Sequence, residues 1–558
     1  MSMPYVIIPP TGADPADEWL KLGVQSHVQG NLPQAQAHYG QALRLDPNNA
    51  TVTQNLAVIF AQSNLLSEAI LTIERAELFD DKMAVLYTNM AYIGLQCERI
   101  GEALDAAKKA VELAPNENTR LALAMVYTTA GKPELSIPLY EQILAAVPNH
   151  PVAGPNICFV QTLTTATPKE LREKRNVWHT HFAYTGPKAP HENTKDPARP
   201  LRVGYVSGDF KTHSAAMIFK PAVTRQSEGL QTYLYSTLPV ADVDVQTKDF
   251  KAFAGERWRD ISAMSDEQAD ALIRQDKIDI LVDLAGHTNG GRLALFTRKP
   301  APVQVTAWGF AHGTGCPEID YFFADQTAIP SSEREFYAEQ IVDLPCIVSY
   351  APMSYDIKRT SRLPYWRNDY VTFGTYARYE KMNDECLGMF SEILKRVPNS
   401  RLEFKDHGCR RPYSIQRTRA VMNDIDPKRL LFSMATSHSE HMQAYQQADL
   451  ILDPFPHSGG VVCLEQMYMG VPMVTRYGTQ AGGRTSASVL TAMGKTDWIA
   501  RSREDYIEKA VAMAVKPQML AAIRKTLSDE FMNSPAIVGY GEKVEAAYRD
   551  MWRTWCGA

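Results

Sequence analysis

Small and large apolar residues recur in a fixed order along the first 150 residues of the chain. The first stretch has the order Trp19, Leu22, Gly23, Gly30, Ala35, Tyr39, Ala42, Pro47. The small residue at Ala35 returns as Ala69, Ala103 and Ser136, at steps of 34, 34 and 33 residues. Proline, which cannot continue a helix, closes three of the four units, and the second has Asp81 there instead. The pattern predicts paired helices over residues 14–150.

This period and this order of residues are the tetratricopeptide signature. The small residues let the two helices of a pair approach closely, and the large residues fill the space between neighbouring pairs. Stacked pairs form a superhelix with a concave groove, which typically holds a peptide or a protein. We therefore expect protein or peptide partners in the groove of this arm.

From residue 201 the pattern changes to short apolar runs that alternate with amphipathic ones. The predicted strands are 201–207, 232–237, 279–285, 303–309, 370–376, 401–405, 429–435, 449–455 and 471–476. Short apolar strands separated by helices predict parallel sheets that are buried on both faces. A proline-bearing segment at 344–354 separates two groups of strands, which predicts two Rossmann-like domains with a cleft between them. Ligands of such sheets bind at the carboxyl ends of the strands.

The predicted fold class is therefore α + α/β, an α-superhelix followed by two Rossmann-like domains. The predicted boundaries are 14–150 for the repeats, 151–200 for a helical cap and proline-rich linker, 201–360 for the first Rossmann-like domain and 361–558 for the second. Residues 536–558 have the pattern of an amphipathic helix, and we expect Trp552 and Trp555 to anchor it.

Composition and charge narrow the possible functions. The net charge of −5 does not favour a nucleic-acid surface, and no apolar run reaches the ~20 residues that cross a bilayer. Residues 1–10 lack the basic and long apolar parts of a secretory signal. The eight cysteines are scattered without a Cys-x-x-Cys pair, which favours a reducing cytoplasm and argues against structural zinc. Asp242 and Asp244 match a metal-binding Asp-x-Asp, but without further ligands nearby no metal is expected.

The segment 453–475 carries the strongest local signal for a ligand site. After a predicted strand, Gly459 and Gly460 lie in a loop, and a helix begins near Val461. Glycines let the backbone approach a ligand closely, and a helix N-terminus offers unpaired N–H groups to a phosphate. Glu465, about one turn into the helix, could accept hydrogen bonds from the hydroxyls of a ribose. The alternative is a plain strand–turn–helix junction with a solvated glutamate.

Arg378 and Lys381 lie in a second loop, 375–385, between a predicted strand and a predicted helix. Cations at this place could neutralise a diphosphate. Surface loops often carry such residues without a function, which is the alternative.

Histidines mark two further segments. His213 lies in 204–217, and histidine is the natural general base near neutral pH, although a helix-start residue bonded to a nearby carbonyl is the alternative. His287, His312 and Gly313 belong to two glycine–histidine clusters in 283–315. These clusters predict the wall of an acceptor or sugar cleft, with two ordinary polar turns as the alternative.

Taken in order along the chain, these motifs resemble one family. Tetratricopeptide repeats followed by LRVGYVSGDF, RKPAPVQVTAWGF, LKRVPNSRL, the glycine loop and MGVPMVT are similar to the O-linked N-acetylglucosamine transferase family, glycosyltransferase family 41. Plant SPINDLY-type O-fucosyltransferases share this architecture. The resemblance covers nearly the whole chain from about residue 14, and the short arm suggests a bacterial member.

The resemblance implies a GT-B fold, a UDP-sugar donor, a protein Ser/Thr hydroxyl as acceptor, and inversion without a metal or other cofactor. It also implies that the C-terminal helix packs onto the first domain. It assigns His213 as base or acceptor-site residue and Lys381 as contact to the diphosphate. The positions that it assigns to the rest of the donor site are Arg378, Thr436, His438, His441, Gly460, Val461, Val462 and Glu465.

The chain departs from the family pattern in its donor loop. Most relatives have hydroxyl side chains where Val461 and Val462 stand, and many have lysine in place of His438. The valines keep the backbone N–H groups but lose two donors to phosphate. The resemblance therefore leaves two alternatives to a protein O-GlcNAc transferase: a UDP-sugar-binding repeat scaffold with weak or no catalysis, or an O-fucosyltransferase that uses GDP-fucose.

Overall fold

The computed structural model describes residues 3–10, 12, 15–352, 357, 359, 361–406, 408–434 and 436–558. The predicted boundaries at residues 14 and 360 and the end of the predicted strand at 435 lie outside these residues. The chain divides into two compact units. The first contains the repeats up to Ala153 together with Arg410–Thr418, and the second contains the parallel sheets.

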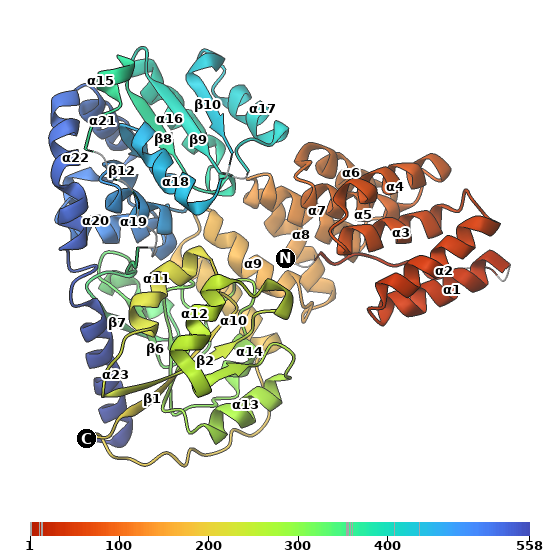
Figure 1. The fold of residues 1–558 in the computed structure, drawn as a ribbon, viewed down its shortest axis with the longest axis horizontal. Helices are drawn as coiled ribbons and strands as arrows, with labels where there is room; N and C mark the ends of the chain where they lie inside the picture. Colours follow the sequence, from red (N-terminus) through yellow and green to blue (C-terminus); the bar gives the residue numbers. More distant parts are fainter. Residues whose placement is uncertain are drawn as a thin grey trace. The chain divides into compact units, whose positions relative to one another are not determined.

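The first unit is built of paired helices, as the repeat pattern predicts. They are α1 (Pro15–Val28), α2 (Leu32–Leu45), α3 (Ala50–Gln62), α4 (Leu66–Phe79), α5 (Ala84–Gln96), α6 (Ile100–Leu113), α7 (Glu117–Thr129) and α8 (Pro133–Ala146). Each odd-numbered helix packs on the helix that follows it (Figure 1). Ala35, Ala69, Ala103 and Ser136 are all buried, with exposed fractions of at most 1%. The prediction of a tetratricopeptide arm is confirmed.

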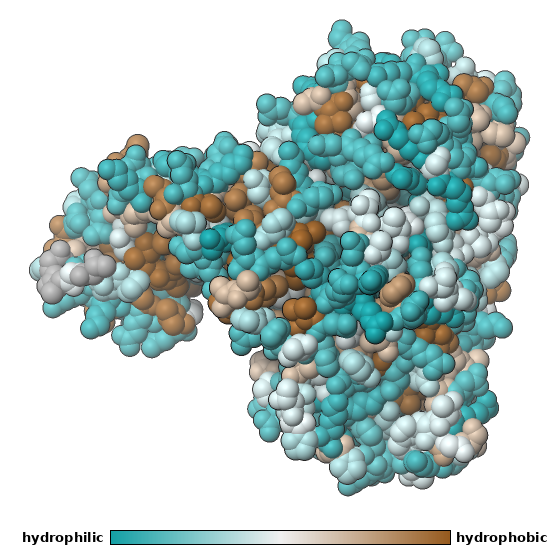
Figure 2. Space-filling view, turned by 180° about the vertical axis from the view of Figure 1, so that it is seen from behind, coloured by the Kyte–Doolittle hydropathy of each residue, from teal (hydrophilic) through white to brown (hydrophobic). Residues whose placement is uncertain are grey.

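Some apolar side chains of the arm stay outside the helix-pair cores. Figure 2 shows brown surface on one face of the repeat helices. Among the exposed large residues of the arm are Val28, Leu71 and Leu78, which are 72%, 68% and 84% exposed. The arm therefore keeps apolar surface in addition to its buried register residues.

The second unit begins with a short helical segment. Its elements are α9 (Ala153–Val160), a 3₁₀ turn η1 (Gln161–Leu163) and α10 (Pro168–Phe182). Helix α10 starts at a capping box, in which Glu170 accepts a hydrogen bond from the Thr167 backbone N–H at 2.7 Å and its own N–H donates back to the Thr167 hydroxyl at 3.3 Å. The proline-rich linker that was predicted follows this helix and leads into the first strand.

The first sheet is parallel and has the strand order β3-β2-β1-β4-β5-β6-β7. The strands are β1 (Leu201–Ser207), β2 (Leu230–Ser236), β3 (Trp258–Asp260), β4 (Ile280–Asp283), β5 (Val303–Thr306), β6 (Tyr321–Ala324) and β7 (Gln340–Asp343). The helices between them are α11 (Ser214–Val223), α12 (Val245–Ala254), α13 (Asp266–Gln275) and α14 (Leu293–Thr297). The sequence did not predict β3, β6 and β7. Strands β3 and β7 lie at the edges of the sheet and carry exposed residues, so they lack the continuous apolar run that marks a buried strand.

The second sheet repeats this topology with the order β10-β9-β8-β11-β12-β13. Its strands are β8 (Thr372–Thr375), β9 (Arg401–Lys405), β10 (Leu430–Ser433), β11 (Leu450–Leu452), β12 (Met473–Arg476) and β13 (Ile499–Ala500). Its helices are α15 (Tyr365–Asn368), α16 (Asp384–Arg396), α17 (Pro412–Val421), α18 (His438–Ala444), α19 (Val461–Tyr468), α20 (Thr485–Ala492), α21 (Arg503–Ala514) and α22 (Pro517–Met532). The predicted pair of Rossmann-like domains is confirmed.

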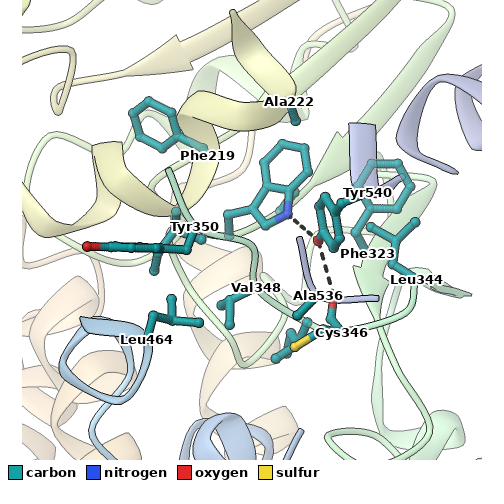
Figure 3. Packing of buried hydrophobic residues seen from close by; sticks show 14 of the residues in the cluster. Phe219, Ala222, Phe323, Leu344, Cys346, Val348, Tyr350, Leu464, Ala536 and Tyr540 are labelled. Atoms are coloured by element: carbon teal, nitrogen blue, oxygen red, sulfur yellow. Dashed lines mark hydrogen bonds between the residues drawn. The ribbon is translucent and has the colours of Figure 1, made fainter. Parts of the chain in front are cut away.

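The C-terminal helix α23 (Tyr540–Cys556) follows the second domain in sequence and packs onto the first domain, as the family resemblance implies. The Tyr540 hydroxyl accepts a hydrogen bond from the Trp308 indole at 2.8 Å and donates to the Cys346 carbonyl at 3.1 Å. Figure 3 shows Tyr540 beside Phe323, in a cluster that also contains side chains of α11 and α19.

The end of α23 is anchored as predicted. Trp552 is fully buried, stacks on Trp555 at 4.8 Å between ring centroids, and donates its indole N–H to the Asp196 carbonyl at 2.9 Å. Among the described residues, no helix combines the length and the apolarity needed to cross a bilayer.

Candidate functional site

The topology places a ligand edge in each sheet. In the first sheet the chain adds strands on one side of β1, beginning with β2, and then on the other side, beginning with β4. In the second sheet β8 has the same place between β9 and β11. Open parallel sheets bind ligands at this switch point, outside the carboxyl ends of the strands. The loops that leave β1, β4, β8 and β11 carry His213, His287, Lys381 and Gly459, so four predicted residues follow switch-point strands.

Lys381 connects two of these loops. It lies in a 3₁₀ turn, η5 (Tyr379–Lys381), after β8, and only 7% of it is exposed. Its Nζ donates to the carbonyl oxygens of Ser458 at 2.6 Å and Gly459 at 3.3 Å, in the loop after β11. Burial, and then the nearby Arg378 cation, lower the pKa of Lys381 to about 7. An anionic ligand would favour the charged form of this amine.

The glycine loop is shaped partly by its own packing. The Gly459 N–H donates to Asp453 Oδ1 at 2.9 Å, and a Cβ on Gly459 would lie 2.8 Å from the same oxygen. Gly460 has φ +66°, which favours glycine, and precedes helix α19. A Cβ on Gly460 would lie 3.9 Å from Lys381 Nζ, so the buried cation lies next to the N-terminus of α19. This junction combines a lysine and helix N–H groups, which are the groups that bind phosphate.

Glu465 lies at the centre of a cluster of hydrogen bonds on the same helix. Its carboxylate accepts from His438 Nε2 at 2.7 Å and lies 3.3 Å from His441 Nε2, and Tyr445 places its hydroxyl 3.2 Å from it. Burial by itself would raise the pKa of Glu465, but the two histidines outweigh it and lower the pKa to about 2. The structure therefore brings His438, His441 and Glu465 together.

The other predicted donor-site residues differ in exposure. Arg378 and Thr436 are exposed, and the Thr436 hydroxyl accepts from Lys405 Nζ at 3.0 Å. Val461 is 9% exposed and packs in the core, whereas Val462 is half-buried. The Val462 carbonyl lies 3.2 Å from the Tyr445 hydroxyl, which connects the start of α19 to the Glu465 cluster.

His213 is exposed at the start of helix α11. Its Nδ1 accepts from the Ala215 N–H at 3.2 Å and lies 3.4 Å from Asp209 Oδ1. Burial raises the pKa of Asp209. If Nδ1 accepts from Ala215, the neutral ring carries its proton on Nε2; if Nδ1 instead donates to Asp209, Nε2 is free to accept a proton. The local contacts of His213 are therefore those of a residue at the start of a helix. Its partner is the backbone N–H of Ala215 and not a carbonyl.

His287, His312 and Gly313 are held in the first domain. His287 Nε2 lies 2.7 Å from the Thr314 carbonyl, and burial lowers its pKa to about 4. Burial lowers the pKa of His312 to about 3, and within the described residues neither ring nitrogen of His312 has a hydrogen-bond partner. Gly313 has φ +72°, and its carbonyl accepts from Arg175 at 3.0 Å.

The sequence did not predict how His312 meets the second domain. A Cβ on Gly482 would lie 2.2 Å from His312 Nε2, and the His457 ring lies 5.7 Å from that of His312. His457 lies in the glycine loop, and its Nδ1 lies 3.1 Å from the Thr162 carbonyl. The histidine itself was visible in the loop sequence, but nothing in the sequence identified Thr162 as its partner.

The segment of η1 and α10 contacts both domains, which a terminal cap alone would not do. Besides the contact of Thr162 with His457, the Thr164 carbonyl accepts from Gln480 Nε2 at 2.7 Å. On the other side, Arg175 is 3% exposed and donates to Gly313 in the first domain. This segment therefore positions loops of both domains.

Asp242 and Asp244 have structural partners instead of a metal-binding cluster. Asp242 pairs with Lys211 at 2.9 Å, and Asp244 caps α12 by accepting from the Thr247 N–H at 2.9 Å. Among the described residues, no group of three or more His, Cys, Asp and Glu side chains is arranged as metal ligands.

Two parallel sheets in one chain, the second with a lysine, a glycine loop and a carboxylate after its switch-point strands, are the arrangement of the GT-B class of α/β proteins, here joined to a tetratricopeptide arm. The chain belongs to glycosyl transferase family 41, whose profile matches residues 171–348 and 347–538. Tetratricopeptide profiles match residues 29–86 and 84–117.

Individual relatives agree with this assignment. The chain is 34% identical over 375 residues to a protein of Petunia hybrida named "Probable UDP-N-acetylglucosamine--peptide N-acetylglucosaminyltransferase SPINDLY". The aligned region covers 65% of this chain and 40% of that protein. A tomato (Solanum lycopersicum) protein with the same name is 32% identical over 418 residues, covering 72% of this chain and 44% of that protein. The chain thus spans less than half the length of these curated relatives.

A solved structure matches nearly the whole chain. It is that of a lysine-to-methionine variant of the Thermobaculum terrenum O-GlcNAc transferase, with a TM-score of 0.80 and 25% identity. The alignment covers 97% of this chain and 98% of that one.

Proposed function

We propose that this protein is a glycosyltransferase that transfers N-acetylglucosamine from UDP-GlcNAc to Ser/Thr hydroxyls of proteins, with inversion and without a metal. The observation that carries the proposal is the contact of buried Lys381 with the loop that begins α19. Membership of family 41 and the printed names of the relatives support the same activity.

In the proposed reaction the acceptor hydroxyl oxygen forms a bond to the anomeric carbon while the bond from that carbon to the β-phosphate oxygen breaks. The bonding electron pair leaves with UDP, and the hydroxyl proton goes to a base or to solvent. Negative charge therefore builds mainly on the diphosphate. Lys381 and the backbone N–H groups of Gly460, Val461 and Val462 are the groups that we assign to neutralise it, in a partly desolvated site.

The remaining donor-site roles are also proposals. We assign Glu465 to the ribose hydroxyls, with His438, His441 and Thr436 around the nucleoside and Arg378 near the phosphates. Glu465 already accepts hydrogen bonds from both histidines, so a bound ribose has to share or replace them. Gly459 keeps the loop compact against Asp453, which leaves the N–H groups of α19 in place.

On the acceptor side we assign His213, His287, His312 and Gly313. His287 and His312 have pKa values of about 4 and 3, so they act as neutral polar groups near neutral pH. His213 can take up the hydroxyl proton only in the tautomer that donates to Asp209 and gives up its bond to the Ala215 N–H. This requirement supports a smaller catalytic role for His213 than for Lys381.

We also propose protein substrates bound through the tetratricopeptide groove, no nucleic-acid or membrane partner, and a cytoplasmic location. The net charge of −5 supports the first exclusion. The eight cysteines all lie in described residues and all are free thiols, which supports a reducing compartment.

A second candidate is a nucleotide-sugar-binding scaffold with little catalysis. Two observations favour it: Val461 and Val462 supply no hydroxyl to a phosphate, and the Glu465 oxygens are already engaged by histidines. A change of donor to GDP-fucose would keep catalysis and change the nucleotide.

Calorimetric titration of the purified protein with UDP-GlcNAc, UDP and GDP, together with a transfer assay, distinguishes the three candidate functions. Micromolar binding of UDP but not GDP, with transfer of radiolabelled sugar to protein, supports the transferase. UDP binding without transfer supports the scaffold, and preference for GDP supports the fucosyl donor. If none of the three nucleotides binds, the proposed function is wrong.

A further inference from the structure

The segment Met3–Pro10 lies against the inner helices of the repeat arm and is held there through its backbone. The Val6 N–H donates to Asn89 Oδ1 at 3.0 Å, and Asn89 Nδ2 donates back to the Val6 carbonyl at 2.7 Å. The Ile8 N–H donates to Asn55 Oδ1 at 3.0 Å, and Asn55 Nδ2 donates to the Ile8 carbonyl at 2.8 Å. In Figure 1 the trace before α1 correspondingly runs back along the arm.

The spacing of these contacts fits an extended peptide. Asn55 on α3 and Asn89 on α5 are 34 residues apart, which is the repeat period, so they occupy equivalent positions in successive helix pairs. The residues that they bind, Val6 and Ile8, are two apart, and in an extended chain alternate residues direct their N–H and C=O groups to the same side. The segment runs opposite to the order of the repeats, because the earlier residue binds the later helix pair.

A buried network holds the two asparagines ready for this contact. Gln54 accepts from Asn89 Nδ2 at 2.6 Å, and its own amide nitrogen donates to Asn55 Oδ1. Asn55 and Asn89 are both 0% exposed. Each asparagine therefore keeps one oxygen lone pair and one N–H for a peptide unit, and that pattern matches any residue except proline at the contacted position.

One side chain adds an anchor. The Tyr5 ring meets Tyr92 edge-on, with 5.9 Å between centroids, and its hydroxyl donates to Gln96. Tyr5 also packs against the core of α3, α4 and α5. The flanking residues Pro4, Pro9 and Pro10 lack an N–H, so they cannot pair with a further strand.

We infer that the segment Met3–Pro10 is a tethered occupant of the repeat groove, which an extended peptide of a partner protein has to displace. The groove recognises the backbone of two alternate residues through Asn55 and Asn89, and the partner is an extended segment with N–H groups at both positions. Because the segment belongs to the same chain, it competes with a partner peptide at a high effective concentration. Only grooves from which the segment has detached can bind a partner. The apparent affinity for the partner is therefore the intrinsic affinity multiplied by the fraction of grooves that are free.

The test uses the full chain and a fluorescein-labelled peptide with the sequence of residues 3–10, MPYVIIPP. In the variant Val6→Pro/Ile8→Pro the segment loses both N–H donors while the groove is unchanged. Fluorescence anisotropy should show peptide binding at least 10-fold tighter to this variant than to the wild type. The matched control is Ile7→Pro, at the residue between the two contacts, which should leave peptide affinity close to that of the wild type.

Adding Asn55→Ala and Asn89→Ala to the Val6→Pro/Ile8→Pro variant should abolish peptide binding. Equal binding of the peptide to wild type and to Val6→Pro/Ile8→Pro would overturn the inference, and so would the absence of binding to that variant. The assay contains no nucleotide sugar, so its outcome is independent of the proposed transferase activity.

Hydrogen exchange of the unmodified protein provides a second measurement that does not depend on the folding of a variant. The amides of Val6 and Ile8 should exchange slowly, and millimolar unlabelled peptide should accelerate them without changing exchange in α6. Fast exchange of both amides in the free protein would overturn the inference.

Discussion

The loop after β8 and the loop after β1 carry the two side chains to which the family resemblance gives catalytic roles, but their surroundings differ. Lys381 is 7% exposed and bonds to carbonyl groups of another loop, 77 and 78 residues away in sequence. The His213 side chain is 46% exposed and bonds to its own helix N-terminus. A charge that is buried against a second loop can act on a ligand in low dielectric, whereas an exposed ring is screened by water.

The largest expected effect comes from Lys381→Ala. The substitution removes the buried cation beside α19, and loss of one preorganised charge-stabilising donor typically lowers kcat by ~10²–10³-fold. Transfer of radiolabelled sugar should fall by this amount, with weaker UDP binding by calorimetry. Lys395→Ala, at an exposed lysine of α16 paired with Glu392, is the control and should retain activity. If Lys381→Ala retained activity, the proposal that the buried lysine contributes more to catalysis than the exposed His213 would be wrong.

The pKa of Lys381 gives the next effect. At about 7 in the empty site, this pKa leaves most of the amine neutral at pH 8 and charged at pH 6. A bound diphosphate favours the charged form and raises the pKa, so UDP affinity should fall as pH rises above 7. UDP binding should take up close to one proton at pH 8 and almost none at pH 6, measured by calorimetry in buffers of different ionisation enthalpy. Uptake at pH 8 that persists in Lys381→Met would contradict this assignment.

His213→Ala should cost less than Lys381→Ala. We expect a loss of activity below the ~10²-fold that removal of a general base typically causes, because the ring is engaged as a helix cap. His213→Asn is the matched control, since asparagine can still accept from the Ala215 N–H. Comparing kcat of the two variants separates the cap from the imidazole. A larger loss in His213→Ala than in Lys381→Ala would reverse the order proposed here.

The smallest effect is a gain. Val462→Thr restores a hydroxyl near the start of α19 at a half-buried position. One added hydrogen bond to phosphate contributes ~1 kcal/mol, or about 5-fold in UDP affinity by calorimetry. Val461→Thr should gain less, because Val461 packs in the core, where the hydroxyl loses apolar contacts. Unchanged affinity in both variants would show that the phosphates do not approach these side chains.

The sequence predicted the helices of the arm and the central strands well, because their apolar periodicity is a local property. Ala35, Ala69 and Ala103 mark the helix pairs in the sequence, because only a small residue fits where the two helices of a pair pack closely. The edge strands β3, β7 and β13 were not predicted. Strands β3 and β7 carry exposed residues in place of an apolar run, and β13 has only two residues. Asn55 and Asn89 also escaped, because two polar residues in otherwise apolar helices carry no signal without their peptide partner.

For the candidate site, the sequence predicted a set of loops but not how they meet. Lys381 and the glycine loop belong to separate sequence motifs, and only the folded structure shows that Lys381 Nζ reaches the Ser458 carbonyl. Gly459 was attributed to a ligand, whereas the structure adds a reason within the chain, the carboxylate of Asp453. The contact of His457 with Thr162 joins residues 295 apart, and no local pattern encodes such a pair.

That contact has a practical consequence for anyone who shortens this chain. A cut before residue 201, where the first strand begins, looks natural from the strand pattern. It would delete the Thr162 carbonyl that meets His457 and the Arg175 guanidinium that supports Gly313, and so remove one contact from a loop of each Rossmann-like domain. A shortened version that starts before Ala153 keeps η1 and α10, and is the better choice for crystallisation or for attaching a different recognition arm.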